Sequence, residues 1–227
     1  MSLLSHLRLY NKKRKSSYRG EIELQLLRFL CDKNKVSIDV GANKGNYTLE
    51  MSKYSKKVLS FEPNTLFNSY LSKMPSNCEV LNKAVSSSND LIFLHAPLFK
   101  NDSKHNMAFI SSKEYEEGSA FIAQVEATRL DQYLSEEIGM IKIDVEGAEI
   151  SVLSTAKKII EKYKPNFLVE GLSKEELEEQ LNFFKTYEYI ALKIIRGKIY
   201  FVKNEKIFEK CREIDRNTIF IPSDNLN

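Results

Sequence analysis

The stretch VSIDVGANKGNYT, residues 36–48, places a glycine-containing turn directly behind a β-branched apolar run. In many α/β proteins a turn of this kind, between a strand and a helix, holds a nucleotide. The dinucleotide fingerprint G-x-G-x-x-G would need glycine at 41, 43 and 46, but Asn43 and Asn46 occupy the last two positions. In the fingerprint, the second glycine lets the backbone approach a pyrophosphate and the third lets the helix pack closely on the strand. Since no G-K-[ST] follows either, the turn disfavours both dinucleotides and nucleoside triphosphates.

What remains is an Asp39-x-Gly41-x-Asn43-x-Gly45 turn, with Glu62 about 20 residues further on, at the end of the next apolar run. A carboxylate at that point can accept both hydroxyls of a ribose. The ligand then has a ribose but no pyrophosphate, which fits S-adenosyl-L-methionine. Its ammonium can bond to Asp39, and its carboxylate can lie against backbone N–H groups of the turn and of the helix that follows. The alternative is a turn with a purely structural role.

Apolar, β-rich runs alternate with segments of helical spacing along the chain, which is typical of βαβ units and a parallel sheet. Four of the runs end in or beside an acid, namely Asp39, Glu62, Asp144 and Glu170. All carboxyl ends of parallel strands meet at one edge, where open α/β folds bind ligands. We therefore expect these acids to gather at one site. The five runs are VSIDV (36–40), KVLSFE (57–62), EVLNKAV (79–85), MIKIDV (140–145) and NFLVE (166–170).

Helical segments and two departures from the alternation complete the expected fold. Ser173 and Glu176 form a capping box before one helix, and Pro165 should end the helix before it. Residues 91–127 indicate a β-rich insertion that would form a lid or acceptor wall beside the ligand edge. The segment YIALKIIRGKIYFV indicates a hairpin that turns at Arg196–Gly197, followed by a last strand in NTIFIPS.

Composition bounds the class of protein. The 227 residues, 42% apolar and 29% charged, suit one folded domain, which we expect to span residues 21–227. Residues 1–20 form a basic arm, with six basic residues and no acid before Gly20; such an arm either contacts nucleic acid or an anionic membrane, or is merely solvated. No run is long enough to cross a bilayer, so we expect a cytoplasmic protein. The three separated cysteines predict buried thiols and no zinc site.

The motifs IDVGANKGNYT, SFEPN, TRLDQYL, IKIDVEGAEISVL and FLVEG, in this order, resemble the FkbM-type methyltransferases, a branch of the class I S-adenosyl-L-methionine-dependent enzymes. The resemblance covers residues 18–171, and KIDVEGAE is its most specific part. It implies an α/β fold with a Rossmann-like, seven-stranded, mostly parallel sheet, one antiparallel strand and helices on both faces. It also implies O-methyl transfer, often to a hydroxyl of a sugar in a glycan or of a secondary metabolite.

The resemblance also implies which residues bind and react. Asp144 and Glu146 would lie where the methyl group is delivered, and the region around Ala84 would lie close to the adenine. The implied cofactor contacts are Asp39, Gly41, Ala42, Asn43, Gly45, Asn46, Tyr47, Thr48, Glu62, Pro63, Asn64, Ala84 and Asp144. Lys44 departs from the family, which usually has an apolar residue there.

A sugar hydroxyl is a poor nucleophile until a base draws off its proton. The candidates for this catalytic base are Asp144, Glu146 and Glu149, followed by His95 and His105 in the insertion. Asp144 could instead only anchor the loop or the cofactor. Glu146 and Glu149 could instead complement a helix dipole. Magnesium on the oxygen-rich group of Asp144, Glu146 and Glu170 is chemically possible, but the sequence does not require a metal.

Two other functions stay open. An RNA methyltransferase could use the basic arm to grip phosphates, but the fourth strand ends in DVEG and not in the Asn/Asp-Pro-Pro-aromatic sequence of enzymes that methylate amino groups of nucleic acids. A non-catalytic glycan-binding or assembly module could retain the same fold.

Overall fold

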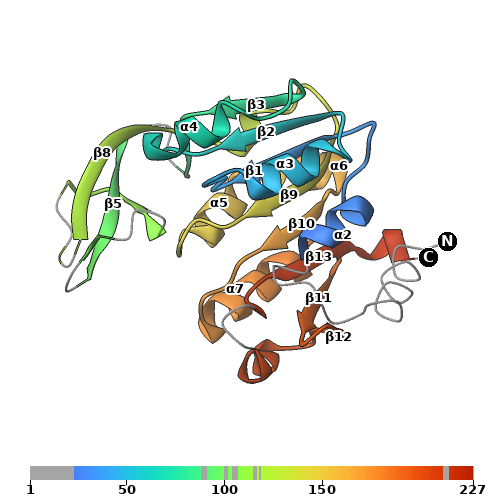
Figure 1. The fold of residues 1–227 in the computed structure, drawn as a ribbon. Helices are drawn as coiled ribbons and strands as arrows, with labels where there is room; N and C mark the ends of the chain where they lie inside the picture. The colour runs from blue at the N-terminus through green and yellow to red at the C-terminus, as the bar shows by residue number, and fades with distance from the viewer. Residues whose placement is uncertain are drawn as a thin grey trace.

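The structure, a computed structural model, describes residues 23–87, 91–99, 102–103, 107–114, 117, 119–211 and 215–226. The expected basic arm and His105 lie outside these residues. The main sheet contains eight strands in the order β12-β11-β13-β10-β9-β1-β2-β3 (Figure 1). Their bounds are β1 (Val36–Val40), β2 (Lys57–Phe61), β3 (Cys78–Leu81), β9 (Ile138–Ile143), β10 (Asn166–Val169), β11 (Tyr189–Ile195), β12 (Lys198–Phe201) and β13 (Thr218–Pro222).

The central strands β10, β9, β1, β2 and β3 run parallel, whereas β13 runs antiparallel to β10 and to β11. This part of the sheet confirms the mostly parallel architecture. The expected strand count is one too low, because β12 pairs antiparallel with β11 as an eighth, outermost strand. The pair forms the expected hairpin, and Arg196 and Gly197 both adopt positive φ, as a tight hairpin turn requires.

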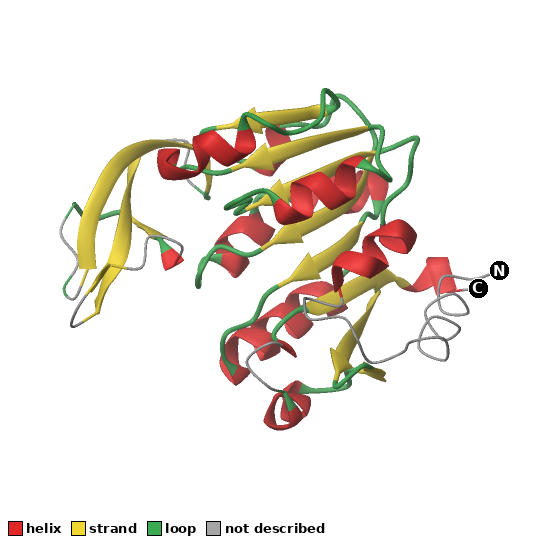
Figure 2. Ribbon diagram, viewed as in Figure 1, coloured by secondary structure: helices red, strands yellow, loops and turns green. Residues whose placement is uncertain are grey.

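Helices cover both faces of the sheet (Figure 2). One apolar cluster joins side chains of α2 and α3, including Leu27 and Met51, to Val58, Met140 and Leu168 of the strands. A second cluster joins α5, α6 and α7 to the opposite face of the sheet. The helices are α2 (Glu23–Leu30), α3 (Asn46–Ser52), α4 (Asn68–Leu71), α5 (Glu149–Ser154), α6 (Lys157–Tyr163) and α7 (Lys174–Lys185), with short 3-10 turns at η1 (Thr65–Phe67), η3 (Leu130–Gln132), η4 (Glu205–Lys210) and η6 (Ser223–Leu226).

Local signals place the helix ends as expected. Ser173 caps α7 by accepting from the Glu176 N–H at 3.1 Å, although the Glu176 carboxylate reaches the N–H of Leu172 rather than that of Ser173. Helix α6 ends before Pro165. In the described part of the chain no helix is both long and apolar enough to span a bilayer.

The insertion forms a second sheet beside the carboxyl ends of the main strands, on the left of Figure 1. It consists of β5 (Leu91–Phe99), β6 (Asp102–Ser103), β7 (Phe109–Ser111) and β8 (Ser119–Thr128). The expected third run, 79–85, is split, because Ala84 and Val85 form a separate strand β4 that leaves the main sheet and pairs with β8. The short strand β4 thus ties the insertion to the main sheet.

The three cysteines are less buried than predicted. Cys31, Cys78 and Cys211 are free and only partly buried. Burial of the Cys31 thiol nevertheless raises its pKa to about 11.

Candidate functional site

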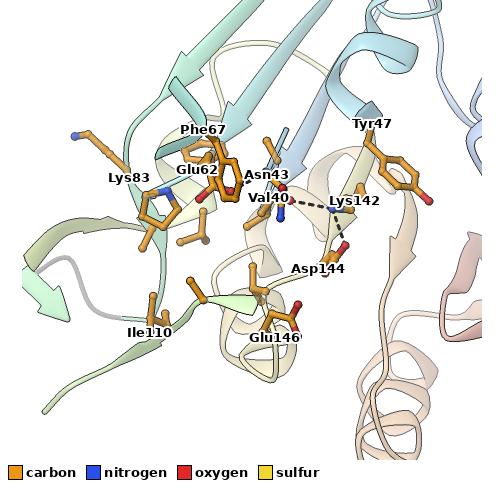
Figure 3. A pocket seen from close by; sticks show the side chains of 18 of the residues that line it. Val40, Asn43, Tyr47, Glu62, Phe67, Lys83, Ile110, Lys142, Asp144 and Glu146 are labelled. Atoms are coloured by element: carbon orange, nitrogen blue, oxygen red, sulfur yellow. Dashed lines mark hydrogen bonds and ion pairs between the residues drawn. The ribbon is translucent and has the colours of Figure 1, made fainter. Parts of the chain in front are cut away.

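A cavity of about 270 Å³ opens at the carboxyl ends of β1, β2 and β9 (Figure 3). Its walls come from the glycine turn after β1, the end of β2, strand β4, the second sheet and the loop after β9. Leu94, Ala108 and Ile110 supply the part from the second sheet, so the insertion borders the site as expected. Figure 3 places Glu62 and Phe67 toward one end and Asp144 and Glu146 toward the other.

The cavity brings together most of the residues expected from the sequence. Those that line it are Gly41, Ala42, Asn43, Asn46, Tyr47, Glu62, Pro63, Ala84, Asp144 and Glu146. Five of the expected residues lie behind its walls instead, namely Asp39, Gly45, Thr48, Asn64 and Glu149.

Gly41 needs to be glycine for two reasons. Its φ is +77°, and a Cβ at this position would stand 1.8 Å from the carbonyl oxygen of Asp144. The turn and the end of β9 are therefore in direct backbone contact. The N–H groups of Gly41 and Ala42 both donate to the carbonyl oxygen of Phe61, at 3.0 and 3.1 Å, which fixes the turn to β2 as well.

Glu62 is held rigidly at the wall of the cavity. Its Oε2 accepts from the N–H of Asn43 at 2.7 Å, and its Oε1 accepts from the N–H of Asn64 at 2.8 Å. Burial raises the pKa of this carboxyl, although the two backbone donors oppose the rise. Each carboxylate oxygen keeps a lone pair beyond these bonds, so the group can also accept from a ligand hydroxyl.

Asp39 is fully buried beneath the turn rather than exposed to the cavity. Its Oδ2 accepts from the Thr48 hydroxyl at 2.7 Å, and Thr48 also bonds to Ser60 at 2.8 Å. The expected contact between Asp39 and a ligand ammonium remains a prediction. In the structure the carboxylate lies behind the cavity wall and contacts Thr48 and Lys142.

Lys142 is the main residue that the sequence reasoning missed. It is 3% exposed and lies at the cavity floor, where its Nζ donates to the Gly41 carbonyl at 3.0 Å. The ammonium also pairs with Asp144 Oδ2 at 3.1 Å and with Asp39 Oδ1 at 3.6 Å. Burial alone would lower the pKa of Lys142, but Asp144 and Asp39 outweigh burial and raise it. The signal was a charged residue inside the apolar run MIKI, where a buried parallel strand normally has none.

Asp144 and Glu170 are two neighbouring carboxyl groups that both line the cavity. Burial and the neighbouring Asp144 raise the pKa of Glu170 to about 9, so Glu170 is a neutral donor at pH 7. Burial opposes ionisation of Asp144, but Lys142 and Glu170 prevail and lower its pKa. Asp144 is thus an ionised carboxylate that is paired with the Lys142 ammonium.

Glu146 and Glu149 have different environments. Glu146 lines the cavity with φ +55°, and no hydrogen bond or salt bridge to another described residue engages its carboxylate. Burial, Asp144 and Glu149 raise its pKa. The Glu149 carboxylate instead accepts from the N–H groups of Val145 at 3.0 Å and of Gly147 at 3.1 Å. Glu149 therefore holds the loop on which Glu146 stands.

The remaining candidates do not join the cavity. Both ring nitrogens of buried His95 have partners, the Ser119 hydroxyl at 3.1 Å and the Lys113 carbonyl at 2.9 Å, and His95 does not line the cavity. Among the residues that the structure describes, no three histidine, cysteine or acidic side chains are grouped so that they could hold a metal ion.

Part of the cavity wall is apolar. Phe67, Ala84 and Val85 line it, with Leu94 and Ile110 from the second sheet. A flat heteroaromatic ring fits such a surface, since it needs apolar contact on its faces. The sequence indicated the region around Ala84, but Leu94 and Ile110 reach the cavity only through the pairing of β4 with β8, of β8 with β5 and of β5 with β7.

The chain matches the protein-family model described as "Methyltransferase FkbM domain" over residues 39–207. This range includes the glycine turn, Glu62 and the loop with Glu146. The comparison with curated proteins gives no match.

Three solved structures with a similar fold are described as methyltransferases or methylases. A methyltransferase FkbM from Methylobacillus flagellatus KT superposes with a TM-score of 0.55 at 11% identity, over 96% of this chain and 58% of that one. A putative rRNA-methylase from Clostridium thermocellum gives 0.53 at 10% identity, over 91% and 97% of the two chains. An rRNA methylase from Streptococcus thermophilus gives 0.50 at 13% identity, over 90% and 96%. At these identities the likeness concerns the fold.

Proposed function

The chain belongs to the FkbM methyltransferase family, and from this premise we propose that it transfers the methyl group of S-adenosyl-L-methionine to a hydroxyl group. The acceptor in this proposal is a hydroxyl of a sugar in a glycan or of a secondary metabolite. One observation carries the proposal, which is that Gly41, Glu62 and Glu146 line the same cavity.

The cofactor would lie along the cavity with its adenosine toward Glu62. The fixed carboxylate would accept from the ribose hydroxyls, and the adenine would pack against the apolar surface at Phe67 and Ala84. The methionine end would then follow the glycine turn toward Asp144. This arrangement would point the methyl group at the acidic end of the cavity.

Glu146 is the base in this mechanism. Its carboxylate faces the cavity without a bonded partner among the described residues, and its raised pKa brings it closer to the operating pH. Bound S-adenosyl-L-methionine would supply the methyl group. Glu146 would take the acceptor O–H proton as the oxygen bonds to the methyl carbon and the C–S electron pair returns to sulfur, which would give a methyl ether and S-adenosyl-homocysteine. Asp144 is the weaker base, because Lys142 and Glu170 lower its pKa.

Charge at the acceptor end favours a neutral substrate over a nucleic acid. Asp144 and Glu146 line that end, and the buried ammonium of Lys142 is already paired with carboxylates. A phosphate placed there would meet like charges. Carboxylates accept readily from sugar hydroxyls, so the same end suits a hydroxyl-rich acceptor.

Transfer of a radiolabelled methyl group tests the proposal. The protein and labelled S-adenosyl-L-methionine are incubated in turn with fractions of glycans, small metabolites, lipids and RNA. We expect label in the glycan fraction or in hydroxylated small metabolites. Glu146→Gln should lower transfer by about 10²–10⁴-fold with unchanged cofactor affinity, because positioned bases contribute this much. The matched control is Glu161→Gln, on the exposed side of α6, which should transfer at the wild-type rate.

The pH profile gives a second readout of the same variant. Since the pKa of Glu146 is raised, transfer by the wild type should fall on the acid side at a pH above the ordinary glutamate pKa of 4.5. Glu146→Gln should lack this acid limb. Label in RNA alone would contradict the acceptor, and a folded wild type that binds no S-adenosyl-L-methionine would contradict the whole proposal.

A further inference from the structure

The mechanism above assigns no role to Lys142, although its ammonium lies in the cavity floor. This lysine occupies the centre of a buried polar network that links three parts of the site. Strand β1 contributes Asp39, which is the register partner of Lys142 in the β1–β9 pair. Helix α3 contributes the ring of Tyr47, whose centroid is 5.0 Å from the ammonium. Lys142 thus stands between the glycine turn and the loop after β9.

Two of its contacts join the two halves of the proposed reaction. The Gly41 carbonyl, at 3.0 Å, belongs to the turn that would carry the methionine end of the cofactor. The Asp144 carboxylate, at 3.1 Å, belongs to the loop that leads to Glu146. Both bonds are made by one side chain that is 3% exposed, so water cannot easily replace either of them.

We propose that Lys142 is a positioning residue of the methyl-transfer site, which fixes the Gly41 turn against the Asp144 loop by bonding both at once. This inference rests on the proposed function, because it assumes that the turn holds the cofactor. Without the ammonium, Asp39 and Asp144 would repel each other below the cavity, and the turn would lose its link to the strand end. The cofactor would then bind to a floor that is no longer held in one geometry.

The chain offers a matched control in Lys193, a second fully buried lysine of the same sheet. Its Nζ donates to three successive backbone carbonyls, those of Asp215 at 3.2 Å, Arg216 at 2.8 Å and Asn217 at 3.3 Å. Lys193 does not line the cavity. Its loss should therefore destabilise the fold without changing how the cofactor binds.

Calorimetric titration with S-adenosyl-homocysteine compares the variants without any acceptor. Lys142→Met should weaken binding by about 10- to 100-fold, since hydrogen bonds to charged groups contribute this much. Lys142→Arg keeps the cation and should recover part of the loss. Lys193→Met should bind as the wild type does. A folded Lys142→Met with wild-type affinity, or an equal loss in Lys193→Met, would overturn the proposal.

A measurement on the wild type covers the case in which Lys142→Met does not fold. Buried lysine ammonium groups give separate nitrogen-15 NMR signals, and each signal is identified by its absence in Lys142→Arg or Lys193→Met. Addition of S-adenosyl-homocysteine should shift the Lys142 signal and leave that of Lys193 in place. An unmoved Lys142 signal with bound ligand would overturn the positioning role. A wild type that binds no ligand would instead refute the proposed function.

Discussion

Two regions of the main sheet each bury a lysine, and they treat it in opposite ways. At the carboxyl end of β9, Lys142 pairs with Asp39 and Asp144, which together outweigh burial and raise its pKa. At the antiparallel edge, Lys193 of β11 bonds to backbone carbonyls, and burial lowers its pKa to about 8.

Both lysines are buried, so their different partners decide whether the pKa of the ammonium is raised or lowered. Carbonyl groups accept the hydrogen bonds of Lys193 but supply no full negative charge. The cost of removing the ammonium from water is therefore largely not offset. The two carboxylates around Lys142 supply that charge, and they keep the lysine cationic beside the cavity. The Lys193 region contributes to the stability of the fold, and we assign the Lys142 region to the methyl-transfer site.

The largest expected contrast comes from glycines in these two regions. Gly41→Ala should weaken cofactor binding by on the order of 100-fold or more, because its Cβ would overlap the Asp144 carbonyl and move the turn. Gly197→Ala changes a residue of similar φ, +76°, in the β11–β12 hairpin. It should cost about 1–2 kcal/mol of stability and leave binding unchanged. Calorimetry and thermal unfolding separate the two effects, and equal affinities in both variants would break the contrast.

Two glutamates that each accept from backbone N–H groups give the next contrast. Glu62→Ala should weaken cofactor binding by about 10- to 100-fold, because a ribose would lose its acceptor and two N–H groups would lose theirs. Glu176→Ala removes the acceptor of the Leu172 N–H near α7 and should cost only about 1 kcal/mol of stability. If Glu62→Ala binds S-adenosyl-L-methionine as tightly as the wild type, the ribose assignment is wrong.

The smallest expected effect is a difference in pH dependence between the two lysines. Between pH 8 and about 10 the unfolded chain still binds a proton at Lys193 that the folded chain has released. The free energy of unfolding of the wild type relative to Lys193→Met should therefore rise by about 2 kcal/mol over this range.

Lys142 should behave differently in the same titration. Its folded pKa lies above the unfolded value of 10.5, so its stabilising contribution is present below that pH and is lost only as the pH rises further. The difference between the wild type and Lys142→Met should thus stay nearly constant from pH 8 to about 10. Chemical denaturation at both pH values measures the two differences, and parallel slopes would contradict the distinction.

The sequence predicted the elements of the fold well where one pattern decides an element. The run VSIDV coincides with β1, because five buried positions between polar segments allow only a central strand. The run EVLNKAV was wrongly read as one strand, because the departure of Ala84 and Val85 toward β8 depends on a partner more than 40 residues away in the chain.

The sequence predicted those site residues that stand at the carboxyl ends of parallel strands. Glu62, Asp144 and Glu170 meet there because parallel strands share an edge. The burial of Asp39 and the role of Lys142 were not predictable, since both depend on the register that sets Asp39 opposite Lys142 across β1 and β9. Glu146 and Glu149 belong to the same motif, so the sequence could not tell which of them lines the cavity. The loop conformation decides this.

A crystal structure of the protein with S-adenosyl-homocysteine tests the central claim most directly. We predict one ligand in the cavity, with its ribose hydroxyls on the Glu62 carboxylate, its adenine against Phe67 and Ala84, and its sulfur toward Asp144. A ligand bound elsewhere, or bound in this cavity with its ribose away from Glu62, would contradict it.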